Sequence, residues 1–304
     1  MELNISIPIS PLFIALLAGL LFANFPRFTL WAKPVLDFAA KRLLRIGVAL
    51  LGFQITFHKY ADIGLKGFVA ILAVVILTFY TVRKSARYFG LSPDLALLIA
   101  GGFSICGASA VTAIGASKKS RSEDISYAVG IVTLCGTLSI FAIPPVAKAL
   151  HLTHRITGAW IGAAVHDIGQ VVATASVVGG TTLSYAVISK LARVVLLAPL
   201  LVLINLKQGD DSTPRSKFSI TTWLPPFILA FIAIAIFNNQ AHLSAGTTNL
   251  LINISKALLS AGLFAMATNV KWRQIRAIGS KPLLFGLSAW LICGAFSLLI
   301  IRVI

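Results

Sequence analysis

The chain has 304 residues, of which 58% are hydrophobic and only 12% are charged. Soluble domains carry about 25% charged residues, so this composition excludes an ordinary soluble protein. The formal net charge is +17, but the Lys and Arg residues form short clusters between apolar runs instead of one basic face. This alternation is typical of membrane proteins and argues against a nucleic-acid partner.

Ten apolar segments follow one another along the chain, and each is close to the roughly 20 residues that a helix needs to cross a bilayer. Because they occupy most of the chain, we predict one all-α membrane domain, residues 1–304, with about ten transmembrane segments. Pro11 to Ala23 follows no basic stretch, so we interpret it as a membrane segment and not as a cleaved signal peptide. The predicted segments are 10–25, 34–57, 65–83, 93–117, 124–147, 156–178, 183–206, 220–238, 248–270 and 281–303.

Basic loops predict the orientation. The polar stretch 207–217 is typical of a flexible linker, and it is rich in Lys and Arg, as are 27–45 and 271–281. The positive-inside rule places these three stretches in the cytoplasm and both chain ends on the opposite face. Loops 118–124 and 148–155 have similar basic counts. The charge pattern therefore leaves open whether segments four and six cross the membrane or turn back as re-entrant hairpins.

Two weak internal similarities indicate repeats. A shift of 215 residues aligns the region of Gly47 with that of Gly262. An odd number of segments separates these copies, so they would lie in opposite orientations, as in many secondary transporters. A shift of 60 residues aligns the region of Gly102 in segment four with that of Gly162 in segment six. On this interpretation, segments four and six each supply half of one central site.

Segment four contains the run Gly101 to Thr112, in which glycines and other small residues replace the usual Leu, Ile and Val. Glycine weakens a helix by about 1 kcal/mol relative to Ala, so we predict a break near Ser104 to Gly107 and a half-helix that starts around Ala108. The free N–H groups and positive end of such a half-helix favour an anion. The hydroxyls of Ser104 and Ser109 would add donors. A close contact between helices is the alternative.

Segment six contains the only acidic residue that lies deep within an apolar run, Asp167. An ionised Asp at the centre of a membrane helix costs about 2.5–3.5 kcal/mol, so such residues are functional by default. On a continuous helix, His166 and Asp167 would both neighbour Gln170. His and Asp together can bind or relay a proton. The alternative is a satisfied polar pair that holds helices together.

Segment seven carries Lys190 and Arg193 one helical turn apart. Arg suits planar oxyanions such as carboxylate or sulfate, so Arg193 is a candidate ligand for an anion. Pairing of Arg193 with Asp167 is the alternative. We interpret Lys190 as a side chain that reaches along the helix toward the membrane interface.

Motifs of other function classes are missing from the sequence. The cysteines Cys106, Cys135 and Cys293 match the spacing of neither a zinc site nor a disulfide framework, and we expect Cys135 and Cys293 to be small buried hydrophobes. The sequence has no HExxH, GxSxG or Walker GxxxxGK[ST] pattern. We therefore predict no metal, no cofactor and no enzyme. A passive anion channel and an intramembrane enzyme are the alternatives to a transporter.

Four runs carry a family resemblance over the whole chain: 45–52, 104–110, 165–171 and 190–194. In these runs the sequence resembles the bacterial family called sulfate exporters, which is related to bile-acid and cation–proton antiporter-like transporters. The resemblance implies inverted repeats, broken helices that cross near the midplane, a multi-pass location in the bacterial inner membrane, and a small anionic substrate. In that family the position of Asp167 is acidic without always being Asp.

We predict a secondary transporter, an exporter or exchanger, of a small anion such as sulfate, a sulfonate or a carboxylate, coupled to protons or a cation. Its partners are the anion and the lipid bilayer, and the sequence leaves the oligomeric state open, a homodimer included. Asp167 and His166 are the candidates for the coupling ion or proton. The candidate substrate-binding residues are Ser104, Cys106, Gly107, Ala108, Ser109, His166, Gln170 and Arg193.

Overall fold

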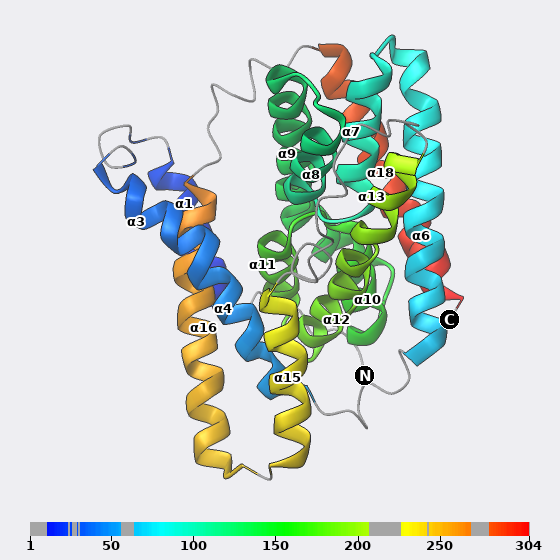
Figure 1. Ribbon diagram of the computed structural model, residues 1–304. Coiled ribbons are helices and arrows are strands. Elements are labelled where there is room, and N and C mark those ends of the chain that lie inside the picture. The colour runs from blue at the N-terminus through cyan, green and yellow to red at the C-terminus, as the bar shows by residue number, and fades with distance from the viewer. Residues whose placement is uncertain are drawn as a thin grey trace.

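The computed structural model describes residues 11–23, 25, 29, 31–55, 64–206, 226–241, 243–268 and 280–303. Within these ranges every regular element is a helix, which confirms the all-α prediction (Figure 1). The predicted linker 207–217 lies outside the described residues. The elements are α1 (Pro11–Phe22), α3 (Lys33–Phe38), the π-helix η1 (Ala39–Leu43), α4 (Leu44–Leu50), the 3₁₀ helix η2 (Leu51–Gln54), α6 (Gly64–Ser85), the 3₁₀ helix η4 (Ala86–Phe89), α7 (Pro93–Ser104), α8 (Ala108–Lys118), α9 (Ser122–Ala149), α10 (His154–Ala164), α11 (Ile168–Val178), α12 (Thr182–Val195), α13 (Leu197–Leu206), α15 (Pro226–Gln240), α16 (Ala245–Ala267) and α18 (Ser280–Arg302).

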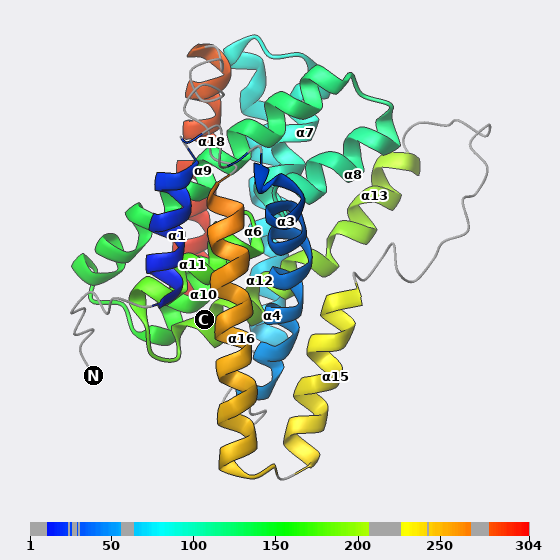
Figure 2. The same cartoon turned by 90° about the vertical axis from the view of Figure 1, so that its left-hand side faces the viewer.

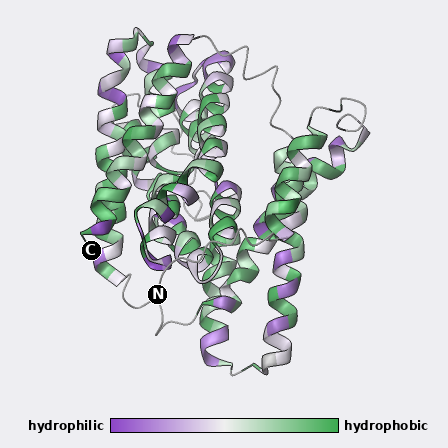
Figure 3. Ribbon diagram, turned by 180° about the vertical axis from the view of Figure 1, so that it is seen from behind, coloured by the Kyte–Doolittle hydropathy of each residue, from purple (hydrophilic) through white to green (hydrophobic). Residues whose placement is uncertain are grey.

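Five helical stretches in the described part of the chain are long and apolar enough to cross a membrane. Shorter apolar helices, among them α1, α7, α11 and α15, accompany them. The predicted count of ten spans is not confirmed by this measure, in part because segments four and six are each divided into two short helices. In Figure 3, α6 is hydrophobic along its middle and hydrophilic at its ends. The five stretches are Gly64–Phe89, Ser122–Ala149, Thr182–Ile204, Gly246–Ala267 and Ser280–Arg302.

The helices form two groups that stand side by side (Figures 1 and 2). The panel consists of α1, α3 to η2, α15 and α16, and the core bundle consists of α6 to α13 and α18. Within the panel, a Cβ on Gly47 would lie 2.8 Å from Leu259, and a Cβ on Gly262 would lie 2.7 Å from Leu44. A shift of 215 residues carries Gly47 onto Gly262 and Leu44 onto Leu259, so these two contacts between α4 and α16 are reciprocal.

Segment four turns back on itself as a hairpin of α7 and α8. A Cβ on Gly102 near the end of α7 would lie 2.8 Å from Val111 near the start of α8. A Cβ on Gly115 near the end of α8 would lie 3.6 Å from Leu98, earlier in α7, and 2.6 Å from Ile125 at the start of α9. The two helices are therefore antiparallel, and the first hairpin enters and leaves at the upper face of Figure 1.

Segment six turns back in the same way, as a hairpin of α10 and α11. The end of α11 returns to the start of α10, because His154 Nδ1 lies 2.7 Å from Thr182 Oγ1 and a Cβ on Gly180 would lie 2.9 Å from the His154 ring. This second hairpin enters from the lower part of Figure 1, opposite the first. Its helices begin and end at positions close to 60 residues after those of the first hairpin.

The hairpins answer the question that the loop charges left open. Neither broken segment continues across the molecule, so the crossing of broken helices that the family resemblance implied is wrong for this chain. The physical reason lies in the packing of the second half-helices. α8 packs along α7 and α11 packs along α10, and both α8 and α11 also pack on the long helix α9. α9 runs between the two faces from which the hairpins enter (Figure 1). Loop 118–121 consequently lies on the same face as the start of α7.

We expect Gly162→Ala to lower the thermal unfolding midpoint of the protein in detergent. Gly162 lets α10 approach α12, and a Cβ there would lie 2.6 Å from Ser189 Cβ and 2.9 Å from the Lys190 backbone nitrogen. Overpacking of this kind costs about 1–3 kcal/mol. Gly294→Ala on α18 is the matched control, because a Cβ there would meet nothing within 4 Å. Equal midpoints for the two variants would contradict this packing.

Candidate functional site

The tips of the two hairpins meet inside the core bundle. α7 ends at Ser104 and α8 begins at Ala108, which confirms the predicted break. Gly107 lies between them with φ +66°, and a Cβ on it would lie 3.3 Å from the His166 carbonyl carbon in the other tip. A side chain at Gly107 would be strained by the positive φ and would press on His166. Glycine is therefore the residue that allows the tips to make contact.

Lys190 joins the two tips through its ammonium group. Its side chain is fully buried, and Nζ donates to the carbonyls of Ile105, at 2.7 Å, and Val165, at 2.9 Å. These carbonyls stand 60 residues apart at the C-terminal ends of α7 and α10. Such helix ends carry partial negative charge, so one cation stabilises both of them. The interpretation that Lys190 reaches for the membrane interface is wrong.

Arg193 extends the same arrangement, which we call the tip clamp (Lys190 and Arg193). The guanidinium is fully buried, and all of its hydrogen bonds go to backbone carbonyls of the two tips. The described residues contain no Arg193–Asp167 ion pair. The acceptors are Ser104 at 3.1 Å from Nε, Phe103 at 2.6 Å from one terminal nitrogen, and Gly162, Ala163 and Val165 around the other.

Cys293 reaches the tips from α18. Its Sγ lies 3.6 Å from the carbonyl oxygens of both Phe103 and Ala164. The sequence interpretation of a small buried hydrophobe is right about burial, but it misses this position between the tips. No local motif marks it, because its partners are backbone atoms far away in the sequence.

Asp167 is the N-cap of α11 and not a residue within a continuous helix. Its Oδ1 accepts from the backbone N–H of Gly169 at 2.9 Å, and the side chain of Gln170 accepts from the backbone N–H of Asp167 at 3.3 Å. This is a capping box, which satisfies the free donors of a helix start. The expected helical face shared with His166 is absent because Val165 and Asp167 have extended backbones. Asp167 remains half-buried.

Gln170 is fixed by the core bundle. It is 2% exposed, and its Nε2 donates to the carbonyl of Thr133 at 3.0 Å and to Thr137 Oγ1 at 3.4 Å, both on α9. Gly136 makes room for it, since a Cβ there would lie 2.6 Å from Gln170 Cδ. The amide is thus occupied by the fold, and its predicted role as a substrate ligand stays a prediction.

His166 is buried without hydrogen bonds. The side chain is fully inaccessible, and its ring meets the edge of the Phe103 ring at a centroid distance of 4.4 Å. Neither ring nitrogen has a hydrogen-bond partner among the described residues. The Phe103 backbone lies near the ring, but no contact between them has the distance and angle of a hydrogen bond. Buried polar atoms without partners are rare, and each needs an explanation.

The two half-helix starts differ in one respect. Gly107, the N-cap of α8, provides no side-chain cap, and the first turn of α8 contains no acid. The position 60 residues later is Asp167, whose carboxylate caps α11. Ser109, in the first turn of α8, is exposed, and Ala108 is half-buried. Positive charge at the start of α8 is therefore not balanced by a side chain of its own cap or first turn.

The remaining candidates of the first tip are less available. Ser104 is fully buried, and its hydroxyl donates to the Gly101 carbonyl at 3.3 Å within its own helix. Cys106 is 7% exposed and has no disulfide partner. The structure thus brings all the predicted site residues to the two tips, but it leaves Ser109, Ala108 and Asp167 as the more accessible ones.

The panel also reaches the tips, through residues that sequence reasoning missed. A Cβ on Gly169 would lie 2.6 Å from Met266 Sδ on α16 and 3.0 Å from Leu44 on α4. Arg45 follows Leu44, is exposed, and attracts the Asp167 carboxylate electrostatically. Its guanidinium lies 5.9 Å from the centre of the Phe227 ring. Arg45 lies in the run 45–52 that carried the resemblance and at the end of the basic stretch 27–45, but neither feature marked it as a site residue.

Comparison with known proteins identifies the family of the chain. The family model described as "Conserved hypothetical protein 698" matches residues 2–286. The chain belongs to this family. It is 34% identical over 274 residues to a UPF0324 membrane protein of Corynebacterium glutamicum, covering 90% of this chain and 79% of that protein. The UPF0324 inner membrane protein YeiH of Escherichia coli K12 is 34% identical over 296 residues, covering 94% and 84%. No solved structure matches.

A third relative, a UPF0324 membrane protein of Neisseria meningitidis, is 35% identical over 298 residues, which cover 95% of this chain and 87% of that protein. Together with the apolar helices, these relatives confirm a multi-pass protein of the bacterial inner membrane. The descriptions of the family and its members specify no substrate. Sulfate and the link to bile-acid transporters stay predictions.

We expect Lys190→Met to destabilise the protein and to loosen the tips. The change removes the donor to two buried carbonyls, and each such loss costs about 1–3 kcal/mol. Thermal unfolding and alkylation of Cys293 by a maleimide, measured by mass spectrometry, should both report it. Lys148→Met, at an exposed position, is the control. A Lys190→Met protein that is as stable as the control, with Cys293 still protected, would contradict the tip clamp.

Proposed function

We propose that the protein is a secondary transporter of a small anion, with its binding site at the hairpin tips. The observation that carries this proposal is the difference between the two tips. α11 starts with a carboxylate of its own, whereas α8 starts with a glycine. A bound anion would accept hydrogen bonds from the free N–H groups at the start of α8, as the Asp167 carboxylate does at the start of α11. Helix starts of this kind bind carboxylate, phosphate and sulfate groups.

The groups around the start of α8 fit a small oxyanion. Ser109 and the first backbone N–H groups of α8 supply donors, and the unpartnered His166 ring lies directly beyond Gly107. Arg45 adds a positive charge from the panel that is not consumed by the tip carbonyls. The tip clamp takes no direct part, because Lys190 and Arg193 already bind backbone oxygens. Sulfate, a sulfonate or a carboxylate would satisfy this donor set.

Asp167 is the proposed coupling residue. Its ionised carboxylate would repel an anion bound at the neighbouring tip, and protonation or a bound cation would remove that repulsion. Anion and proton would then favour each other's binding, and this coupling is reciprocal. His166, next to it in the chain, is a second proton acceptor. The two roles are separate in this proposal. The cations of the tip clamp bind backbone carbonyls and hold the tips together, whereas the carboxylate of Asp167 gains and loses the coupling proton.

The symmetry of the site supports transport through alternating access. Two hairpins that enter from opposite faces, with equivalent bounds 60 residues apart, are what inverted repeats produce. The reciprocal contacts between α4 and α16 have the pattern of a two-fold relation. On this proposal, the ten predicted segments consist of full spans and two re-entrant hairpins, and the anion site is reached from either face in turn as the core bundle and panel move relative to each other.

We expect Ser109→Asp to abolish uptake of labelled anions into proteoliposomes, while Ser109→Asn keeps it. The Asp carboxylate would occupy the positive start of α8 and repel the substrate, whereas Asn has nearly the same shape without the charge. Because Ser109 is exposed, both variants should fold, and Ser109→Asp should unfold no lower than the wild type, since an acid in the first turn of a helix is stabilising. We expect at least a tenfold difference in initial rate. Equal uptake by the two variants would show that the anion does not bind at the start of α8.

We expect Asp167→Asn to uncouple sulfate uptake from a pH gradient. Asn also caps helices well, so α11 should form normally, but the titrating group is gone. Initial rates with and without the gradient provide the measurement, and Asp167→Glu, which keeps an acid, should retain the stimulation. Saturable uptake with counter-exchange would separate a carrier from a channel. Persistent stimulation in Asp167→Asn would rule out Asp167 as the coupling residue.

A further inference from the structure

The carbonyl oxygens at the two helix breaks form a site for positive charge. Ile105 is the C-cap of α7 and Val165 is the C-cap of α10, and both carbonyls lie at hydrogen-bond distance from one nitrogen atom. In secondary transporters with broken helices, unwound carbonyls and the C-terminal ends of half-helices coordinate the coupling ion. The corresponding place in this protein is where the two tips meet.

The ammonium of Lys190 occupies this place. Its Nζ lies 2.7 Å from the Ile105 oxygen and 2.9 Å from the Val165 oxygen, and the side chain has no exposed surface. An ammonium is a compact point charge, so it can take the position of a small monovalent cation between two oxygens. Unlike a bound ion, this charge is attached to α12 and cannot leave the protein with a substrate.

Arg193 binds the neighbouring carbonyls. Its guanidinium donates to oxygens of both tips, among them those of Phe103, Ser104 and Ala163. Two fixed positive charges therefore lie among the tip carbonyls, about one turn apart on α12. A further cation at the tips would be repelled by both charges, and it would have to displace their hydrogen bonds.

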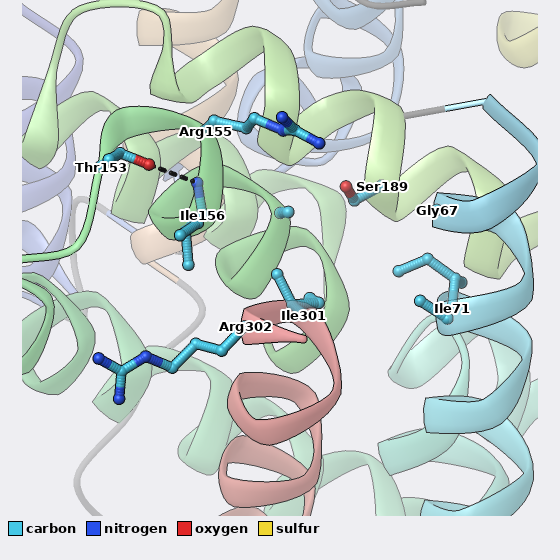
Figure 4. A pocket seen from close by; sticks show the side chains of 10 residues that line it. Gly67, Ile71, Thr153, Arg155, Ile156, Ser189, Ile301 and Arg302 are labelled. Carbon is cyan, nitrogen blue, oxygen red and sulfur yellow. Dashed lines mark hydrogen bonds between the residues drawn. The ribbon is translucent and has the colours of Figure 1, made fainter. Parts of the chain in front are cut away.

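The cavity between α6, α10, α12 and α18 does not replace this ion site (Figure 4). Its volume is about 420 Å³, and Ile71, Ile156 and Ile301 make much of its wall apolar. Among the described residues that line it are Arg155 and Arg302 but no acidic residue. Figure 4 shows these arginines on α10 and at the end of α18. A lining of isoleucines and arginines does not attract a metal cation.

Asp167 remains for the coupling ion, and its surroundings favour a proton over a metal cation. The charged and titratable groups that act on its carboxylate are Lys190 from α12, Arg45 from α4 and Cys106 from the first tip, and His166 precedes it in the chain. A metal cation would be repelled by the two basic groups, and it would need several further oxygen ligands. A proton needs only the carboxylate.

We propose that Lys190 is a tethered replacement for a coupling metal ion, and that the protein couples anion transport to protons without Na⁺ or K⁺. The statement about coupling rests on the proposed function, whereas the cation site between the tips does not. The ammonium neutralises the ends of α7 and α10 throughout transport. The proton that binds Asp167 crosses with the anion and is released on the other side.

The first test empties the cation position. Lys190→Ala removes the ammonium and leaves room between the tip carbonyls, whereas the matched control Lys190→Met fills this room with an apolar side chain. The wild type and both variants are purified in NaCl, KCl, ethylammonium chloride or choline chloride at equal ionic strength. Choline is too bulky for the emptied position. The thermal unfolding midpoint is measured in each salt.

We expect the midpoint of Lys190→Ala to be several degrees higher in the small cations than in choline, because a cation that binds only the folded state stabilises it. The wild type and Lys190→Met should have the same midpoint in every salt. A Lys190→Ala midpoint that responds to none of the small cations would overturn the cation site. A wild type that Na⁺ or K⁺ stabilises over choline would show a free metal-ion site and would also overturn the proposal.

The second test uses the wild type alone and decides the matter if neither variant folds. Uptake of labelled sulfate into proteoliposomes is driven by a pH gradient, in Na⁺ and K⁺ or in N-methylglucamine only. We expect equal initial rates. A rate that falls when Na⁺ and K⁺ are removed would overturn the inference and leave the transporter standing. No sulfate uptake in any salt would count against the proposed function, and the midpoints of Lys190→Ala would still decide the cation site.

Discussion

The ammonium of Lys190 donates to two carbonyls that belong to helices arriving from opposite faces of the molecule. Burial of a cation costs several kcal/mol unless its hydrogen bonds are satisfied, and the unwound backbone of the tips leaves carbonyls that also need partners at membrane depth. Lys190 and Arg193 meet both requirements at once. The two hairpins can therefore end in the middle of the protein, with Gly107 against His166, without unpaired backbone oxygens at these points.

With the negative ends of α7 and α10 occupied by the tip clamp, the positive ends of α8 and α11 become the free electrostatic feature of the site. Asp167 balances one of them, and the cap and first turn of α8 contain no such acid, which is why we propose this end for the anion. On this account, function depends on one difference between two otherwise equivalent tips. The N-cap of α8 is Gly107, whereas the N-cap of α11 is Asp167.

The sequence predicted the features that come from local chemistry. Glycines at 101, 102 and 107 placed the break in segment four, and the cost of an isolated Asp marked Asp167. The direction of the chain after each break could not be predicted, because loops 118–124 and 148–155 carry similar charge. The role of Lys190 could not be predicted either, since its partners are backbone carbonyls 85 and 25 residues away. Every residue has such a carbonyl, so the residue types do not show which ones accept a hydrogen bond. Arg45 was missed because it acts across the boundary between panel and core bundle.

The re-entrant path of both hairpins is the claim on which the site depends, and labelling from each face of the membrane tests it most directly. Single cysteines at Tyr88, Ser120, His151 and Thr181 can be read with an impermeant maleimide in oriented vesicles, because the three native cysteines are buried. The account predicts that positions 88 and 120 label from one face and that positions 151 and 181 label from the other. Labelling of 88 and 120 from opposite faces would show that segment four crosses the membrane, and it would contradict the meeting of opposed tips.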